Sequence, residues 1–149
     1  MPNLKVRIPA PGSRDSRAVD SDDVIRELDL APHPEGGWYR ETWREAAVTA
    51  IYYLLRAGER SHWHRVDATE IWHFYDGDPL ELSVAAGDGR SRATSHLLRC
   101  EQPQLVVPAG DWQSARSLGR WSLVGCTVSP AFRFEGFELA GPGWNPGEV

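Results

Sequence analysis

The sequence contains no apolar run that approaches the roughly 18 residues of a membrane-spanning helix. Its first residues also lack the apolar segment of a secretory signal, so we expect a cytoplasmic protein with no membrane partner. Cysteine is scarce, because Cys100 and Cys126 are the only two and neither belongs to a CxxC pair. This excludes a disulfide-rich scaffold, a zinc ribbon and a thioredoxin-type motif, and we expect two reduced thiols packed as small apolar residues.

A basic surface is also missing from the sequence. The formal net charge is −5 and the isoelectric point is about 5.5. Lysine occurs once, as Lys5, and the arginines do not gather into the kind of cluster that lines a phosphate-binding groove. We therefore expect neither nucleic acid nor an anionic membrane surface as a partner.

Turn-forming and aromatic residues, by contrast, are plentiful. The 149 residues include 14 Gly, 11 Pro and 7 Trp, and this mixture of turn formers and β-formers predicts many short strands in one domain. Residues 1–20 are rich in proline and lack periodicity, so we expect a mobile arm, with a loosely docked strand from Leu4 to Ile8 as the alternative. The single domain is placed at 21–140 and an irregular tail at 141–149.

One helix and a series of strands are expected within the domain. Residues 22–30 predict the helix, because Asp20 or Ser21 can cap it and Val24, Ile25 and Leu28 form one apolar face. The segment 48–55 is nearly all apolar, which is typical of a central strand buried on both faces. Short strands between turn signals predict a sandwich or a barrel. The expected strands are 38–44, 48–55, 62–66, 70–75, 80–85, 94–99, 104–107, 114–116, 121–128 and 132–139.

One region concentrates side chains that can hold a metal or move a proton. His62 and His64 are two residues apart on an expected strand, so both should point to the same face. Glu70 begins the next strand and shares its face with Trp72 and Phe74. Two imidazoles and one carboxylate form a ligand set that leaves coordination positions free for water or substrate. A His-x-His pair that simply faces solvent is the structural alternative.

The same region resembles the first cupin motif, G-x5-H-x-H-x3–4-E-x6-G. This sequence has three residues between Gly58 and His62 and five between His64 and Glu70, so the spacing departs slightly from the motif. The second cupin motif, G-x5-P-x-G-x2-H-x3-N, is represented only by the P-x-G that starts at Pro108. Gln113 stands where that motif has histidine, and its carbonyl oxygen would be a weaker ligand than an imidazole.

Longer stretches resemble the DUF985 (cupin 5) family of small single-domain RmlC-like cupins. These stretches are 30–41, 50–55, 61–80 and 124–139, and the resemblance covers residues 22–140. It implies an all-β fold, the double-stranded β-helix or jelly-roll barrel of cupins, and commonly a homodimer. It implies no settled reaction, although members are often likened to deoxysugar epimerases of the same fold. Some relatives lack the complete His-x-His pair, whereas this chain keeps both histidines and the glutamate, which favours a metal.

Several other residues are candidates for the same pocket. Tyr52 and Tyr53 alternate, and the inward one could act as a general acid, with Tyr53 preferred. Trp112 could form part of the pocket wall, and Glu41 lies on a strand near the entrance in this family's fold. The loop that contains His33 and Glu35 could offer either side chain, but backbone freedom at the following glycines is the favoured explanation of its sequence.

Three functions follow from these residues. The first is an enzyme in which His62, His64, Glu70 and Gln113 hold zinc, nickel, iron or manganese for isomerase, epimerase or lyase chemistry on a small polar molecule. An iron-dependent oxygenase is a lesser variant of it. The second is a metal-free, deoxysugar-epimerase-like enzyme with a histidine base and a tyrosine acid. The third is a non-catalytic module that binds a small ligand through Trp63, Trp72, Phe74 and Trp112.

Overall fold

A computed structural model describes residues 19–148. The predicted arm at 1–18 and the alternative strand from Leu4 to Ile8 lie outside the described residues. Helix α1 (Ser21–Glu27) begins at Asp20, whose carboxylate accepts a hydrogen bond from the Asp22 backbone N–H. It ends earlier than predicted because Asp29 adopts a left-handed conformation, with φ 54°, just after the cap. No helix formed by the described residues has the length and apolar character needed to cross a membrane.

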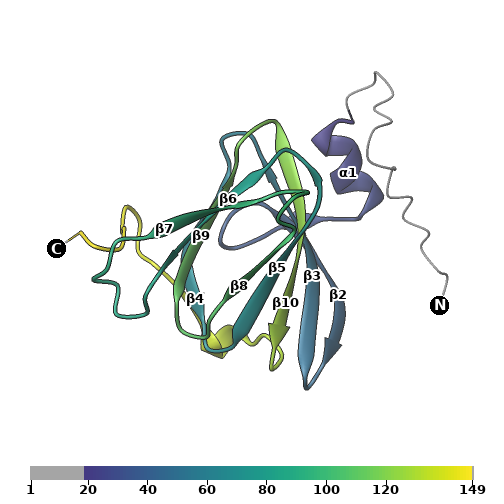
Figure 1. Cartoon of the computed structure of the whole chain (residues 1–149). Helices are drawn as coiled ribbons and strands as arrows, with labels where there is room; N and C mark the ends of the chain where they lie inside the picture. The colour runs from purple at the N-terminus through teal and green to yellow at the C-terminus, as the bar shows by residue number, and fades with distance from the viewer. Residues whose placement is uncertain (1–18, 149) are drawn as a thin grey trace.

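The strands form two antiparallel sheets that face each other (Figure 1). The larger sheet has the order β1-β2-β3-β10-β5-β8 and the smaller one the order β11-β4-β9-β6-β7. This is the jelly-roll architecture expected from the sequence. The larger sheet contains β1 (Ala31–Pro32), β2 (Trp38–Glu45), β3 (Val48–Arg56), β10 (Trp121–Ser129), β5 (Thr69–Gly77) and β8 (Gln104–Val107). The smaller contains β11 (Phe137–Leu139), β4 (Arg60–Val66), β9 (Trp112–Ser117), β6 (Leu80–Ala85) and β7 (Thr94–Leu98).

The last predicted strand is only partly correct. Residues 132–139 were expected to be extended, but Phe134–Gly136 forms a 3₁₀ turn, η1, and only the three residues of β11 pair with β4. The Asp67 backbone N–H donates a hydrogen bond to the Gly136 carbonyl, which holds this turn in place. It places Phe132, Phe134 and Phe137 side by side at one end of the barrel.

The main core lies between the two sheets. Strand β3 supplies Tyr53 and Leu55 to this core, while its other face, with Leu54, packs under α1. The prediction of a central strand covered on both faces is therefore confirmed. On β5, Trp72 is buried in the core and His73 lies on the opposite face, where its Nε2 is 3.0 Å from the Thr127 hydroxyl. The alternation predicted for this strand thus holds.

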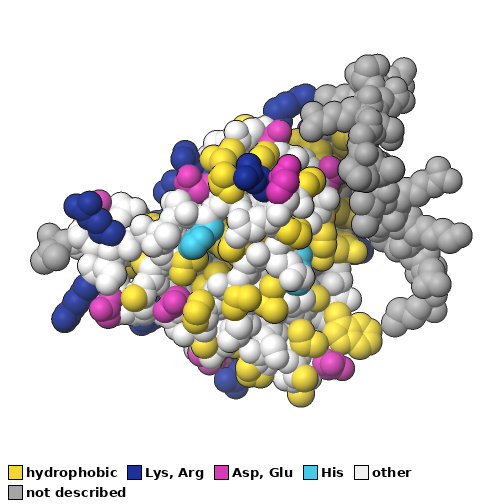
Figure 2. All heavy atoms as spheres, viewed as in Figure 1, with side chains coloured by type: hydrophobic (Ala, Val, Ile, Leu, Met, Phe, Trp, Pro, Cys, Tyr) yellow, Lys and Arg dark blue, Asp and Glu magenta, His cyan; other side chains and the backbone are white. Residues whose placement is uncertain are grey.

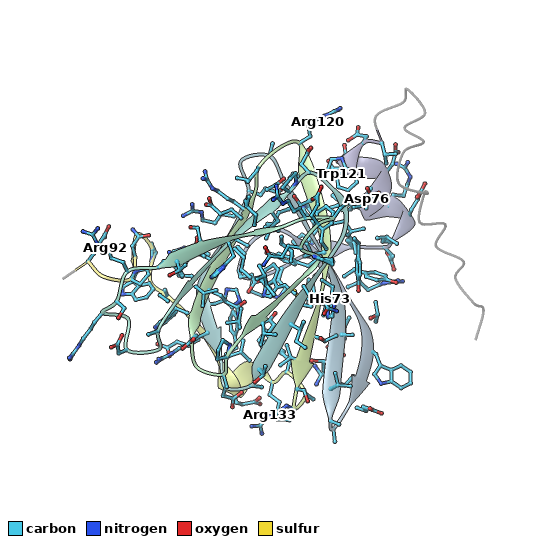
Figure 3. All side chains as sticks on the ribbon, in the orientation of Figure 1. His73, Asp76, Arg92, Arg120, Trp121 and Arg133 are labelled. Carbon is cyan, nitrogen blue, oxygen red and sulfur yellow. The ribbon has the colours of Figure 1, made fainter. Side chains whose placement is uncertain are left out.

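Two of the other apolar clusters involve α1 and the C-terminal tail. Helix α1 lies against the outer face of the larger sheet, beside Trp121 (Figures 1 and 3). The tail has no regular structure but is packed in place, because Trp144 contacts Trp63 and Trp112 on the smaller sheet. Acidic and basic side chains are scattered among one another on the face shown in Figure 2.

Candidate active site

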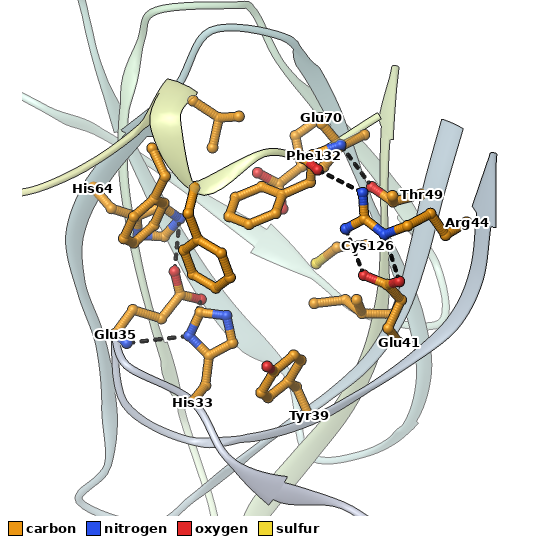
Figure 4. Close-up of a pocket in the computed structure, with 15 residues that line it drawn as sticks. His33, Glu35, Tyr39, Glu41, Arg44, Thr49, His64, Glu70, Cys126 and Phe132 are labelled. Carbon is orange, nitrogen blue, oxygen red and sulfur yellow. Dashed lines mark hydrogen bonds and ion pairs between the residues drawn. The ribbon is translucent and has the colours of Figure 1, made fainter. Parts of the chain in front are cut away.

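A cavity of about 70 Å³ opens at the end of the barrel near η1 (Figure 4). At 10–15 Å³ for each water, it holds about five water molecules or one small organic molecule. Polar and acidic side chains gather on two opposite sides of it, and apolar rings and methyl groups lie between them. The lining residues are His33, Glu35, Tyr39, Glu41, Arg44, Thr49, Ile51, His64, Val66, Glu70, Cys126, Val128, Phe132, Phe134 and Phe137.

The loop from His33 to Gly37 carries one side of the cavity. The Tyr53 hydroxyl donates a hydrogen bond to the Gly36 carbonyl, and the His62 backbone N–H donates to the Glu35 carbonyl over 2.8 Å. Gly36 and Gly37 have φ values of 105° and 75°, which side chains rarely permit. The loop is thereby fixed to both sheets, and Glu35, with 8% of its surface exposed, faces the cavity.

A β-bulge in β4 decides which histidine reaches the cavity. Ser61 pairs with Ala115 and His64 with Gln113, so two residues, His62 and Trp63, lie opposite the single Ser114. The extra residue reverses the alternation, and His64 faces inward while His62 Nε2 lies 3.0 Å from the Gly141 carbonyl in the tail. The prediction that His62 and His64 share a face is therefore wrong.

His64 and Glu35 share one proton. His64 Nδ1 lies 2.8 Å from the His62 carbonyl oxygen, which can only accept, so this nitrogen carries the hydrogen. The bare Nε2 of neutral His64 then lies 3.1 Å from Glu35 Oε2. Two acceptors at this distance need a proton between them. Because burial raises the pKa of Glu35 to about 8 and lowers the pKa of His64, the proton resides on Glu35 at neutral pH.

Glu70 lies on the inner face of β5 and is held by Gln113. The Gln113 side-chain NH₂ donates to Glu70 Oε2 over 2.8 Å, and its carbonyl oxygen accepts from the Trp72 indole N–H over 2.7 Å. An indole can only donate, so Trp72 fixes which way the amide points. Burial raises the pKa of Glu70, and the nearby Glu35 acts in the same direction. Burial also raises the pKa of the Cys126 thiol, which contacts Glu70.

His33 remains neutral beside this pair. Its Nδ1 accepts the Glu35 backbone N–H over 3.1 Å, which places the hydrogen of neutral His33 on Nε2. Burial, and secondarily His64, lowers the pKa of His33 to about 4. The deep side of the cavity thus contains two carboxyl groups and two neutral imidazoles, with no guanidinium or ammonium group.

The opposite side of the cavity contains an ion pair. Arg44 donates from Nε and Nη2 to the two oxygens of Glu41, over 2.7 and 2.8 Å, and from Nη1 to the Phe132 carbonyl over 2.9 Å. This bidentate pair raises the pKa of Arg44, with hydrogen bonding to Glu41 as the main cause. Arg44 therefore joins β2 to the segment that carries the phenylalanine rings (Figure 4).

Comparison with known proteins now identifies the family. The model of the cupin superfamily (DUF985) matches residues 22–140. The chain belongs to this cupin family. No curated protein matched the sequence.

Solved structures agree with this assignment. The cupin is 36% identical to protein SO0799 from Shewanella oneidensis, with a TM-score of 0.78 over 83% of this chain and 86% of that one. A hypothetical protein from Leishmania major is 30% identical, with a TM-score of 0.76 over 82% and 88% of the two chains. Oxalate decarboxylase from Bacillus subtilis is 12% identical and shares the fold, with a TM-score of 0.61 over 77% of this chain and 30% of that one. Another structure of that decarboxylase is named for its Mn(II) centres.

The predicted metal ligands of this cupin do not fit a metal ion. His62 points into the tail and the Gln113 oxygen accepts the Trp72 indole N–H, so neither side chain is presented to the cavity together with His64 and Glu70. His64 and Glu70 remain at the cavity, but His64 Nε2 lies against Glu35. Across residues 19–148, no group of three or more His, Cys, Asp and Glu side chains is placed to hold an ion.

The structure separates the other predicted site residues of this cupin. Glu41 lines the cavity, but Trp72 and Phe74 belong to the main core and Trp112 to the cluster under the tail. Tyr53 faces inward and is fully buried, with its hydroxyl bound to the loop backbone. Their roles in substrate binding or catalysis stay predictions.

Sequence reasoning placed too little weight on four cavity residues. His33 and Glu35 were recognised as a functional alternative, but Tyr39 and Cys126 were not assigned to the site. The signal available for Glu35 was its position directly before two glycines, since a loop forced into an unusual conformation can turn a neighbouring side chain inward.

Proposed function

We propose that this cupin catalyses proton transfer on a small polar molecule in the cavity, in an isomerase-, epimerase- or lyase-type reaction that needs no metal. The observation that carries the proposal is the 3.1 Å contact between Glu35 Oε2 and His64 Nε2 at the cavity wall. This contact keeps an acidic proton on a buried carboxyl whose pKa of about 8 is close to the working pH of an enzyme. Of the predicted functions, this proposal is nearest to the metal-free enzyme, with Glu70 and Glu35 in place of the predicted histidine base and tyrosine acid.

The two buried carboxyl groups can divide the work. Glu70 takes a proton from a substrate C–H, and the N–H donated by Gln113 stabilises the carboxylate form that can do so. Glu35 gives its proton to the substrate oxygen, and hydrogen bonding from Ser61 favours the carboxylate that remains. Return of the first proton to the former carbonyl carbon, together with transfer of the proton of the neighbouring substrate hydroxyl to Glu35, completes an isomerisation and restores the enzyme. The Tyr53 proton is already used on the loop backbone, so Tyr53 positions Glu35 rather than acting as the acid.

Solvent deuterium exchange tests this proposal. We expect wild-type protein in D₂O to exchange the C–H next to the carbonyl of at least one compound in a panel of small hydroxy- and aminocarbonyl compounds, followed by proton NMR. Glu70→Gln and Glu35→Gln should each slow this exchange by about 100-fold or more, which is the typical contribution of one acid–base group. Glu138→Gln, at an exposed ion pair with Arg65, is the matched control.

Three other outcomes of these experiments would count against the proposal. Exchange that survives both cavity variants would show that the reaction occurs elsewhere and would overturn the proposal. Saturable binding of a panel member without any exchange would instead favour the non-catalytic binding module. Metal content that rises with activity would favour the metal-dependent reaction.

We further propose that the protein is a cytoplasmic homodimer. The resemblance to small cupins supports the dimer, and so do large apolar side chains that remain exposed, including Trp43 and Val106 at 51% and 59%. The two unpaired cysteines are compatible with a reducing compartment. Size-exclusion chromatography with light scattering is expected to give twice the chain mass of 16.7 kDa. A mass equal to one chain at micromolar concentration would contradict the dimer.

A further inference from the structure

We propose that the ligand of this cavity carries a positively charged ammonium group. This inference rests on the proposed function, because it concerns the same cavity, and it adds the charge class of the substrate. It follows from the charges that line the cavity, from the partners of each charge, and from the rings between them.

Acidic groups outnumber basic groups around the cavity. Its lining contains three carboxyl groups, Glu35, Glu41 and Glu70, and the only permanently charged base there is Arg44. Glu41 binds Arg44 through both carboxylate oxygens. The pair cancels its own charge. This leaves Glu70, and Glu35 when it gives up its proton, without a compensating cation.

Both remaining carboxyl groups are deeply buried. Glu35 is 8% exposed and Glu70 is 6% exposed. Their side-chain partners are a neutral imidazole, an amide, a thiol and the hydroxyl groups of Ser61 and Tyr53. No Lys or Arg among residues 19–148 forms an ion pair with either carboxyl. A buried carboxylate is costly unless a cation compensates it, so a cationic ligand would gain the attraction that the protein itself leaves unused.

The wall between these carboxyl groups and the ion pair suits the same ligand. Phe132, Phe134 and Phe137 contact one another edge to face, with ring centroids 5.1 to 6.2 Å apart, and Tyr39 also lines the cavity. Aromatic rings attract cations through the negative potential of their faces. A space of about 70 Å³ accommodates the ammonium end of such a ligand.

Within residues 19–148, the cavity offers no free cationic group to an anionic ligand. The edge of Arg44 that suits a carboxylate or phosphate is already occupied by Glu41 at 2.7 and 2.8 Å. A third contact ties Nη1 to the Phe132 carbonyl. An anion would have to displace Glu41 from Arg44, and the released carboxylate would then repel it.

Three probes of nearly equal size separate these possibilities. Ethanolamine, ethylene glycol and glycolate each have a hydroxyl at one end. The group at the other end is an ammonium, a second hydroxyl and a carboxylate, respectively. In titrations near pH 7, followed by the His33 and His64 ring resonances, we expect ethanolamine to bind at least tenfold more tightly than either of the others. Following these resonances keeps weak pairing with surface carboxylates out of the measurement.

Three variants of cavity residues test the inference further. Glu70→Gln should weaken ethanolamine binding by about tenfold, the typical effect of losing a charged hydrogen-bond partner. Glu35→Gln replaces a carboxyl that is protonated near pH 7 and should weaken it less. Both variants should leave ethylene glycol binding nearly unchanged. Arg44→Gln frees Glu41 and should strengthen ethanolamine binding several-fold, whereas an anion site would be lost. Glu138→Gln serves as the surface control.

The result that would overturn this inference is glycolate or ethylene glycol binding as tightly as ethanolamine. Absence of ethanolamine binding at the highest soluble concentration would overturn it as well. Because these are binding measurements, they can fail while deuterium exchange succeeds on an uncharged compound. In that case the proton-transfer function stands and only the ligand class is wrong.

Discussion

Replacing Glu35 with glutamine is expected to make the protein more stable than wild type at pH 8. The Glu35 carboxyl has a pKa of about 8 in the folded protein, against an ordinary value of 4.5. As pH rises between these values, the unfolded chain releases this proton while the folded protein retains it. The contribution of Glu35 to stability is therefore fully present below pH 4.5 and is lost as pH rises toward 8. Glutamine cannot ionise, and its NH₂ can still donate to His64 Nε2.

The size of this effect on stability follows from the shift in the pKa of Glu35. One pKa unit corresponds to about 1.36 kcal/mol, so the full range sets an upper limit of roughly 5 kcal/mol. His33 has the opposite sign, because its pKa is lowered from 6.5 to about 4 and its contribution is lost as pH falls through that range. Between pH 6.5 and 8 the Glu35 effect is therefore the cleaner one. There we expect wild type to lose roughly 2 kcal/mol more than Glu35→Gln.

Urea denaturation at intervals from pH 5 to pH 8 measures this difference. Glu138→Gln, at the exposed pair with Arg65, should follow the wild-type pH dependence and change stability by no more than about 1 kcal/mol. Some slope should remain in Glu35→Gln, because the pKa of Glu70 is also raised by burial. Parallel curves for wild type and Glu35→Gln would mean that Glu35 is ionised in the folded protein, and the assignment of the shared proton to Glu35 would then be wrong.

Most of the fold could be predicted because it depends on local patterns. The apolar segment 48–55 and the alternation from Glu70 to Phe74 report directly which faces are buried, and both agree with the structure. Proline and glycine mark the turns between strands, because proline fixes its φ angle and glycine permits a positive φ. The end of the helix was less predictable. It depends on Asp29, which adopts a left-handed conformation that residues other than glycine seldom adopt.

The site was harder to predict because it depends on register and on distant partners. A strict alternation puts His62 and His64 on one face, and only pairing with β9 reveals the extra residue that turns His62 away. The direction of the Gln113 amide depends on Trp72, which lies 41 positions away in the sequence. Glu35 enters the cavity through a loop, where no periodicity indicates the direction of a side chain.

The loop that carries Glu35 leads to the second large effect, which is expected for Gly36→Ala. Gly36 has a φ of 105°, and an added Cβ would lie directly against the Arg60 carbonyl oxygen. Because that oxygen belongs to the backbone of β4, it cannot move aside as a flexible side chain would. The loop must shift instead, which disturbs the hydrogen bonds from Tyr53 and His62 and withdraws Glu35 from His64.

Gly110→Ala provides a matched control for backbone strain. Gly110 also has a positive φ, 84°, but an added Cβ there would meet nothing within 4 Å. We expect Gly110→Ala to cost about 1–2 kcal/mol of stability, the usual cost of a left-handed conformation for a residue with a Cβ. Gly36→Ala should cost about 3 kcal/mol or more, because the steric conflict adds to the same strain.

Urea denaturation and the pH dependence of stability together decide the outcome. If the loop positions Glu35 as described, Gly36→Ala should lose the steep fall in stability above pH 6.5, since a displaced carboxyl in contact with water no longer retains its proton. Gly110→Ala should keep it. Equal costs for the two variants, with the wild-type pH dependence intact in both, would show that the loop can adapt to the methyl group without moving Glu35. The closely packed glycine would then have no part in building the site.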